Sequence, residues 1–354
     1  MGGAGLAQRP RRLSFLDDLD ESQGVAGGGM GSATSARFQQ EKQEGKEKRV
    51  HRPDDAAAAP EKRPRLAEDA STGGRLMRTF CGVAETIGKK RTMEDRSSVI
   101  QLADGRVFVG VYDGHAGPCA AEHAAATLHT RLDVAPPAGG SSNAAMWEAA
   151  YEQCEREILR RFRDGTTACT AVLRGEELSL ANVGDSRCVL GGGGRRRRLS
   201  ERLTTDHKPD VPAERARVEA HGGRVVHRGA YRVFHESCPL LLAVSRSLGD
   251  FALKKHPGLI SATPEVTDRS LKPGWDDFAI FATDGLWDVV SDADAVGIVY
   301  DTIGEALASG SVTQELCTEA ASKCIQAARK RCTMDNVLVL VLCFQWRPKS
   351  GAAA

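Results

Sequence analysis

Four aspartates stand at the ends of apolar stretches whose composition is typical of β-strands. The four aspartates, each given with its apolar stretch, are Asp113 after 107–112, Asp185 after 178–183, Asp284 after 278–283 and Asp335 before 337–344. Because Asp335 precedes its stretch whereas the others follow theirs, antiparallel neighbours in a sheet would bring these ends to the same edge. Carboxylates gathered within about 5 Å repel one another and raise each other's pKa unless a cation neutralises them. Such a gathering would therefore favour a cation site.

The ligand types favour a hard divalent cation. The four groups offer only oxygen, and at most one histidine, His115, belongs with them. Mg²⁺ and Mn²⁺ prefer oxygen ligands, whereas zinc prefers cysteine and histidine. Two such ions that share a carboxylate can activate a water for displacement at phosphorus. The residues alone leave a simpler interpretation open, because Asp-Gly and Gly-Asp pairs also form the turns of any β-rich protein.

The composition is that of a globular protein without a strongly charged surface. The chain has 354 residues, of which 41% are hydrophobic, and a net charge of +1. This balance argues against a protein adapted to nucleic acid or to anionic lipid. No stretch has the roughly 18 apolar residues of a membrane helix, so we expect no membrane partner. Ten cysteines occur without a Cys-x-x-Cys pair, and we expect neither a disulfide framework nor structural zinc.

Hydrophobic patterns predict a mixture of strands and helices. The dipeptide Asp104-Gly105 separates two strand-like stretches and is typical of a hairpin. Further short strands joined by tight turns must pair in antiparallel fashion. The expected strands are 97–102, 106–112, 168–173, 178–183, 187–190, 240–244, 278–283 and 337–344, and the expected helices are 118–132, 144–162, 212–221, 291–307 and 313–331. Strands in two clusters with helix pairs between them predict an α+β fold, a β-sandwich flanked by helices.

Residues 1–76 lack hydrophobic periodicity, so we expect a disordered tail. Within it, 11–15 (Arg-Arg-Leu-Ser-Phe) resembles a site for a basic-directed kinase, and 62–65 (Lys-Arg-Pro-Arg) resembles a nuclear-import signal. The start of the chain has no signal-peptide pattern, and we expect the nucleus or the cytoplasm as its location. Another charged run, 191–198, is interpreted as a flexible basic hairpin tip. Its alternatives are a docking site for an acidic partner and phosphorylation at Ser200.

Eight short motifs occur in the order that one enzyme family has them. They are 92–95 (Thr-Met-Glu-Asp), 111–117 (Val-Tyr-Asp-Gly-His-Ala-Gly), 165–168 (Gly-Thr-Thr-Ala), 180–187 (Leu-Ala-Asn-Val-Gly-Asp-Ser-Arg), 203–209 (Leu-Thr-Thr-Asp-His-Lys-Pro), 242–250 (Leu-Ala-Val-Ser-Arg-Ser-Leu-Gly-Asp), 282–288 (Ala-Thr-Asp-Gly-Leu-Trp-Asp) and 335–337 (Asp-Asn-Val). By these motifs the chain resembles the metal-dependent protein serine/threonine phosphatases of type 2C, in their plant form. A single motif would be weak, but eight in order are far beyond chance.

The resemblance implies a four-layer α-β-β-α sandwich of two antiparallel sheets flanked by helices. It implies a phosphatase domain over 77–346, followed by a short tail over 347–354. It also implies two Mn²⁺ or Mg²⁺ ions, bridged by Asp113 and contacted by the carbonyl oxygen of Gly114. The other implied ligands are Asp284 and Asp335 in direct contact, Glu94 and Asp95 through bound water, and Asp185 and Asp288 for a third, weaker ion. His115 is the implied general acid in the hydrolysis of phosphoserine and phosphothreonine.

Two positions depart from the family pattern. The family has a phosphate-gripping arginine three residues before the Met of the Met-Glu-Asp motif, where this chain has Lys90, followed by Arg91. A lysine is a point charge and cannot form the two-pronged contact of an arginine, so both residues are candidates for binding phosphate. The stretch 331–334 stands where a Gly-Ser pair is usual, and we expect that change to affect only the turn.

Two other functions compete with this interpretation. A pseudophosphatase scaffold would keep the fold without turnover, and Lys90 is the only feature in its favour. Nucleic-acid binding through the arginines of 195–198 is disfavoured, because one basic loop in a neutral protein is a small footprint. The leading prediction is a monomeric, metal-dependent hydrolase that acts on phosphorylated proteins, without nucleic-acid or membrane partners. The identity of the substrate protein does not follow from the sequence.

Overall fold

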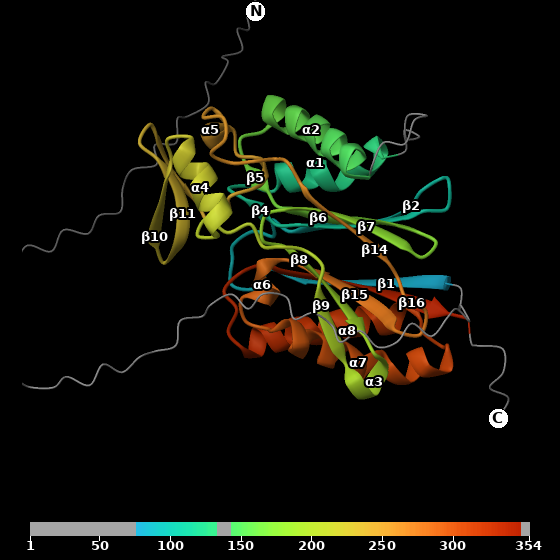
Figure 1. The fold of residues 1–354 in the computed structure, drawn as a ribbon. Coiled ribbons are helices and arrows are strands. Elements are labelled where there is room, and N and C mark those ends of the chain that lie inside the picture. The colour runs from blue at the N-terminus through green and yellow to red at the C-terminus, as the bar shows by residue number, and fades with distance from the viewer. Residues whose placement is uncertain (1–75, 133–142, 348–354) are drawn as a thin grey trace, which may run out of the picture. The chain divides into compact units, whose positions relative to one another are not determined.

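The computed structural model describes residues 76–132 and 143–347, which all belong to the second of two units of the chain, 69–354. The kinase and import motifs expected in the N-terminal tail lie outside the described residues, as do 348–354. Two five-stranded antiparallel sheets form the centre of the described part, and helices cover the outer face of each (Figure 1). The four-layer α-β-β-α sandwich is therefore confirmed.

The first sheet has the strand order β1-β16-β15-β8-β9. Its strands are β1 (Leu76–Thr86), β16 (Val337–Trp346), β15 (Asp276–Ala282), β8 (Arg187–Gly192) and β9 (Leu199–Arg202). β16 pairs with β1 on one side and β15 on the other, and its side chains are buried alternately against the helices and against the other sheet. Burial on both faces explains its almost continuous apolar sequence, and the central position expected for 337–344 is confirmed.

The second sheet has the order β14-β7-β6-β3-β2. Its strands are β14 (Glu265–Ser270), β7 (Glu177–Val183), β6 (Ala168–Arg174), β3 (Val107–Tyr112) and β2 (Arg96–Gln101). The expected hairpin joins β2 to β3, and Gly105 has a φ of +85°, which a residue with a side chain rarely adopts. A third apolar cluster fills the space between the two sheets.

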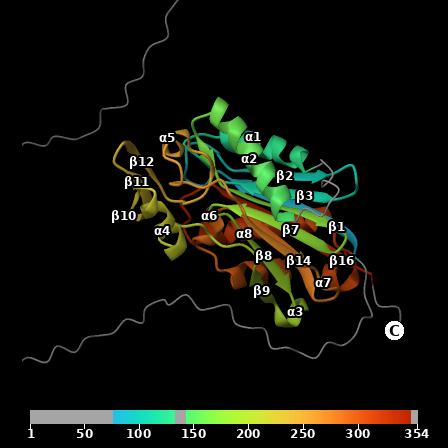
Figure 2. The same cartoon turned by 45° about the horizontal axis from the view of Figure 1, so that its top comes forward.

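Two pairs of helices cover the sandwich. The helices are α1 (Cys119–Thr127) with the 3₁₀ turn η1 (Leu128–Arg131), α2 (Asn143–Arg161), α7 (Asp292–Ser309) and α8 (Gln314–Lys330). α1 and α2 pack on the second sheet, and α7 and α8 pack on the first (Figure 2). The hydroxyls of Ser291 and Thr313 accept hydrogen bonds from the first turns of α7 and α8, which fixes where these helices begin.

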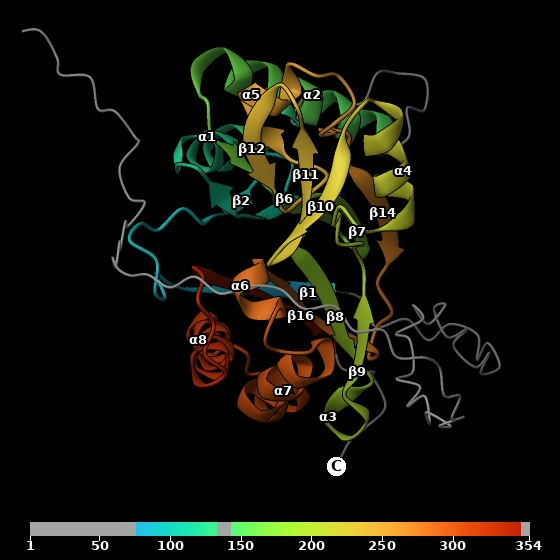
Figure 3. The ribbon, with the colours of Figure 1, turned by 90° about the vertical axis from the view of Figure 1, so that its left-hand side faces the viewer.

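A small three-stranded sheet with two helices lies at the left of the sandwich in Figure 1 and faces the viewer in Figure 3. It consists of β10 (Arg224–Arg228), β11 (Ala230–His235) and β12 (Cys238–Leu242), with α4 (Pro212–Ala220) and α5 (Phe251–Lys254). The expectation of a buried strand at 240–244 was wrong. In the part of the chain that the structure describes, β12 pairs only with β11, and its side chains are largely open to solvent, with Pro239 exposed and Leu240 50% exposed. An apolar sequence does not distinguish such an edge from a core strand.

The basic run 191–198 forms the tip of the hairpin between β8 and β9, as expected, but it is not an open loop. Its middle is the short helix α3 (Gly194–Arg197). Arg195 pairs with Glu305 at 2.8 Å, and Arg198 pairs with Asp301 at 2.6 Å, both on α7. These partners are more than 100 residues away in the chain, so no local pattern reveals them.

α8 packs so closely on β1 that Gly82 has no room for a side chain. A Cβ there would lie 2.1 Å from the backbone nitrogen of Thr318 and 2.2 Å from the carbonyl carbon of Cys317. Because backbone atoms can yield only if the helix shifts, Gly82→Ala is expected to lower the free energy of unfolding by about 1–3 kcal/mol.

The matched control is Gly297→Ala on α7, where a Cβ would meet only Arg198 at 4.0 Å. There alanine is expected to raise the free energy of unfolding by about 0.5–1 kcal/mol through its helix propensity. Urea unfolding of both variants measures the difference. Equal stabilities would contradict the close packing of α8 on β1.

Candidate metal centre

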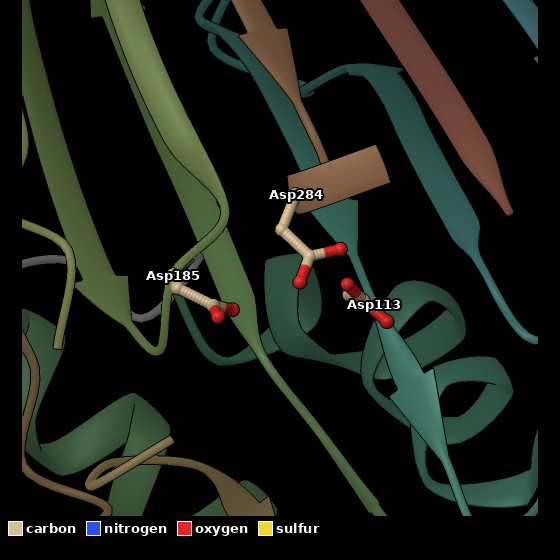
Figure 4. Close-up of side chains that lie close together, drawn as sticks. All are labelled: Asp113, Asp185 and Asp284. Carbon is tan, nitrogen blue, oxygen red and sulfur yellow. The ribbon is translucent and has the colours of Figure 1, made fainter. Parts of the chain in front are cut away.

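Three carboxylates converge where strands of the two sheets end (Figure 4). Asp113, Asp185 and Asp284 each offer an oxygen that lies within 4.8 Å of those of the other two. Asp113 follows β3, Asp185 follows β7 with one glycine between, and Asp284 opens the short helix α6 (Asp284–Trp287) after β15. The structure thus brings together three of the four aspartates that stand at strand ends in the sequence.

The electrostatics of this cluster are unfavourable without a cation. Burial raises the pKa of Asp113 well above its usual range, and the charges of Asp95 and Asp185 raise it further. Burial likewise raises the pKa of Asp284, with Asp113 and Asp185 adding to the effect. Burial is also the main cause that raises the pKa of Asp95 to about 8. Each raised pKa means that the ionised carboxylate is poorly compensated in the fold. A bound cation would stabilise the ionised form.

Asp335 approaches the cluster from the start of β16. Its Oδ1 accepts a hydrogen bond from Nζ of Lys90 at 2.7 Å, and its charge contributes to the raised pKa values of Asp95 and Asp113. Burial lowers the pKa of Lys90, but its hydrogen bond to Asp335 and the charges of Asp335, Asp113 and Asp284 together raise the pKa above its usual value. Arg91 has an exposed side chain. Of the two candidate phosphate contacts, Lys90 is the one that points at the carboxylates.

Asn336 ties the segment 87–94 to Asp335. Its Oδ1 accepts from the backbone nitrogen of Glu94 at 2.8 Å, and its Nδ2 donates to the carbonyls of Ile87 and Thr92. The carbonyl oxygen of Glu94 lies within 2.5 Å of where a Cβ on Gly114 would stand, so the backbone of Glu94 passes next to the residue that follows Asp113. Asn336 belongs to the motif 335–337, and that position is the only sequence signal for its role.

The remaining acidic residues have defined places around the cluster. Asp95 is buried, and its Oδ2 accepts from the hydroxyl of Thr283 at 2.9 Å. Asp288 directly follows the last residue of α6 and donates its backbone N–H to the carbonyl of Asp284, and its pKa is raised mainly by burial. Asp185 forms an ion pair with Lys208 from the motif 203–209. Lys208 therefore compensates part of the negative charge, which the motif alone does not reveal.

Gly114 and His115 are held by a small three-stranded sheet. β4 (Gly114–His115) pairs with β5 (Gly165–Thr166), which pairs with β13 (Leu248–Gly249). The hydroxyl of Thr167 accepts from the backbone nitrogen of Asp113 at 3.0 Å. A Cβ on Gly114 would lie 2.5 Å from the carbonyl oxygen of Glu94, so this glycine lets the segment 92–95 pass close by.

His115 has a partner that sequence patterns alone do not identify. Its Nε2 lies 2.9 Å from both carboxylate oxygens of Asp250. Burial lowers the pKa of His115, but the charge of and bond to Asp250 raise it by more. Burial raises the pKa of Asp250, and His115 and Ser247 lower it by more. Both shifts favour an imidazolium facing a carboxylate.

The backbone at Asp250 and Gly165 allows the side chains of His115 and Asp250 to meet. Asp250 has a φ of +58°, a left-handed conformation that is costly for a residue with a side chain. A Cβ on Gly165 would lie 2.4 Å from both Nε2 of His115 and Oδ2 of Asp250, so only glycine fits between them. Asp250 is the last residue of the motif 242–250, and its place there is the signal that could have pointed to it.

The turn 331–334 also contains a left-handed residue. Cys332 has a φ of +61°, at the stretch where the family usually has a Gly-Ser pair. The hydroxyl of Thr333 donates to the carbonyl of Gly285 at 2.8 Å, which links this turn to α6. The turn therefore helps to set the position of Asp335 relative to Asp284.

The donor set fits hard divalent cations. Its members are carboxylate oxygens, and the ammonium groups of Lys90 and Lys208 compensate only part of their charge. Mg²⁺ and Mn²⁺ favour such oxygen ligands. Geometry and charge thus agree on the class of ion.

Comparisons with known proteins place the chain among phosphatases. The family model described as "Protein phosphatase 2C" matches residues 79–337. "Probable protein phosphatase 2C 59" of Oryza sativa subsp. japonica is 37% identical over 271 residues, covering 74% of this chain and 75% of that protein. "Probable protein phosphatase 2C 71" of Arabidopsis thaliana is 35% identical over 291 residues, covering 79% of this chain and 59% of that protein.

Solved structures show the same fold. A serine-threonine phosphatase 2C from Toxoplasma gondii superposes with a TM-score of 0.64 at 24% identity, over 76% of this chain and 97% of that one. At this identity the likeness concerns the fold alone.

Among the described residues, no helix combines the length and apolar character that crossing a membrane would need.

In protein kept free of metal by a chelator, Asp113→Asn is expected to stabilise the fold at pH 8 and to change little at pH 4. A pKa that is higher in the folded than in the unfolded state means that stability is lost as the pH rises from the ordinary value near 4 towards the raised one. Removing the charge should restore on the order of 2 kcal/mol at pH 8.

Chemical unfolding at the two pH values measures this effect. Asp210→Asn, which changes an exposed carboxylate, is the control and should be neutral at both. If Asp113→Asn destabilised the metal-free protein at pH 8, the repulsion inferred for the cluster would be refuted.

Proposed function

Because this chain belongs to the protein phosphatase 2C family, a family of phosphoprotein phosphatases, we propose that it hydrolyses phosphoserine and phosphothreonine in proteins with the help of two divalent cations. The observation that carries the proposal is the convergence of Asp113, Asp185 and Asp284, with Asp335 beside them, next to a histidine that is held by a carboxylate. The substrates are phosphorylated proteins.

Asp113, Asp284 and Asp335 and the carbonyl of Gly114 would hold two ions, Mn²⁺ or Mg²⁺, with Asp113 shared. When bound, such a pair supplies an activated water for in-line displacement at phosphorus. Glu94 and Asp95 would act through water, and Asp185 and Asp288 would hold a third, weaker ion. The raised pKa values of Asp113 and Asp284 support this assignment, because they mark the carboxylates with most to gain from a cation.

Lys90 is proposed as the contact to the phosphoryl group. Both side chains are exposed, but the ammonium of Lys90 contacts the carboxylate of Asp335. A single ammonium cannot grip two oxygens as an arginine does, so we expect looser orientation of the substrate than in relatives with an arginine there. The ammonium still supplies positive charge where the transferred group becomes negative.

His115 is proposed as the general acid that protonates the leaving alkoxide. Because Nε2 is engaged by Asp250, the proton is donated from Nδ1. Asp250 fixes the orientation of the ring and stabilises its protonated form. Asp250 is thus a positioning residue that acts through His115, and the left-handed backbone at Asp250 is the cost of that geometry.

The proposal also covers the oligomeric state of the chain, its location and its lack of a nucleic-acid ligand. The chain acts as a monomer in the nucleus or cytoplasm, although the import motif 62–65 lies outside the described residues. Nucleic acid is not its ligand. The ion pairs of Arg195 and Arg198 with α7 support this, because they neutralise part of the basic run.

The direct test is release of phosphate from a phosphothreonine peptide. Wild-type protein should turn over with Mn²⁺, and a chelator should stop it. Asp113→Asn should fall to the background rate, because the proposed bridging ligand is lost, while Asp210→Asn should match wild type. Phosphate release is measured directly. A wild-type protein that binds Mn²⁺ but gives no turnover would favour a pseudophosphatase scaffold.

A second test separates proton donation from general damage to the site. His115→Ala and Asp250→Asn are expected to lower kcat on a phosphoserine peptide by about 10²–10⁴-fold, because the alkoxide leaving group needs a proton. On p-nitrophenyl phosphate, whose leaving group is a stable anion, the loss should be much smaller. Steady-state kinetics on both substrates decide, and equal losses on the two would mean that these residues hold the site together and do not donate a proton.

A further inference from the structure

The sequence Arg-Arg-Leu-Ser occurs twice in the chain, at 11–14 and at 197–200. The second copy lies in the described structure, where it runs from the end of α3 into β9. It has no part in the metal centre. Its residues therefore need a separate explanation.

Ser200 is accessible. Its side chain is exposed, and its hydroxyl has no hydrogen-bond partner within 76–132 and 143–347. Among the strands of the described ranges, β9 pairs only with β8 and stands at the edge of its sheet. Leu199 beside it is 40% exposed, and Arg197 is exposed with its guanidinium over the ring of Trp275 at 5.6 Å.

We propose that Ser200 is a phosphorylation site for an arginine-directed serine kinase. Arg197 and Arg198 stand three and two residues before the serine, Arg197 exposed over Trp275 and Arg198 paired with the exposed Asp301, which an acidic group of a kinase can replace. The serine and Leu199 are already in the extended conformation of an edge strand, which can add to another chain without unfolding the core of the sheet.

The chemistry is transfer of the terminal phosphoryl group of ATP. Oγ of Ser200 forms a bond to the γ-phosphorus while the bond from that phosphorus to the β–γ bridging oxygen breaks. ADP leaves, and the hydroxyl proton passes to the catalytic aspartate of the kinase. The product is a phosphoserine with a charge of about −1.5 to −2 at neutral pH.

That charge would fall between two existing ion pairs. Side chains alternate along a strand, so Ser200 shares a face with Arg202, whose Nε donates to Asp292 of α7 at 2.9 Å. On the other side, Arg198 donates to Asp301 of α7 at 2.6 Å. A phosphate on Ser200 attracts both arginines and repels both aspartates. It therefore loosens the hold of α7 on the tip of this hairpin.

Asp292, which accepts from both Arg202 and Arg187, limits how far the loosening of the hairpin spreads. Asp292 also accepts from Arg187 at 2.6 Å, and Arg187 donates to Asp206 at 3.0 Å. When Arg202 turns to the phosphate, Asp292 keeps Arg187 as its partner. The expected effect is thus confined to the hairpin from α3 to β9.

The test uses the full chain, cyclic-AMP-dependent protein kinase as the arginine-directed probe, and adenosine 5′-O-(3-thiotriphosphate) as the donor. A thiophosphoryl group resists hydrolysis, so the chain's own proposed phosphatase activity does not erase the result. The Ser14→Ala chain should incorporate thiophosphate stoichiometrically at Ser200, located by mass spectrometry. The Ser14→Ala/Ser200→Ala chain should fall to background.

Adding Arg197→Ala to the Ser14→Ala chain should slow incorporation by about tenfold or more, because one of the two recognition charges is lost. Incorporation that is absent from the native Ser14→Ala chain, or that occurs only after heat denaturation, would overturn the site. Neither outcome depends on whether the protein is a phosphatase.

The structural effect has its own readout. In the thiophosphorylated Ser14→Ala chain, backbone amides of the hairpin 194–203 should exchange hydrogen several-fold faster than in the unmodified chain, while those of α8 stay unchanged. Stoichiometric modification with no change in hairpin exchange would overturn the proposed loss of the ion pairs to α7.

Discussion

Like charges that a fold brings together repel one another, and here Asp113, Asp185 and Asp284 are brought together by segments that follow three different strands. Rigid strands hold their ends in place, so the carboxylates cannot move apart without disturbing a sheet. The charges of Lys90 and Lys208 relieve part of the repulsion. Bound cations would relieve the rest of the repulsion between the carboxylates, and the stability of this edge of the sandwich depends on that compensation.

Beside this cluster, the chain keeps a second charged arrangement that is fully compensated. His115 and Asp250 face each other, and the pKa shifts of both favour the ion pair. The absence of a side chain at Gly165 makes their contact possible. The aspartate cluster thus needs positive charge from bound cations, whereas the neighbouring carboxylate of Asp250 is compensated by the imidazolium of His115. Such a division suits a reaction in which a cation-activated water attacks and a protonated histidine releases the leaving group.

Much of this could be predicted from the sequence because the relevant signals are local. The apolar run of β16 follows from burial on both faces, and the direction of the chain at Asp335 indicates which edge it joins. Contacts between distant segments were beyond such patterns. Asp250 lies in a recognisable motif, but nothing in the letters shows that it faces a histidine 135 residues earlier. The basic hairpin tip is ordered by acids on α7 for the same reason, and β12 looks like a core strand because its open face is invisible in the sequence.

Asp113 is proposed to hold two cations at once, and counting the bound Mn²⁺ ions tests this role. Equilibrium dialysis with metal analysis, or the loss of the free-ion signal in electron paramagnetic resonance, gives the number of tightly bound ions per chain. We expect two bound ions for the wild-type protein, one for Asp335→Asn and none for Asp113→Asn, because only the shared ligand serves both ions. A wild-type protein that binds a single ion, or an Asp113→Asn variant that still binds two, would contradict it.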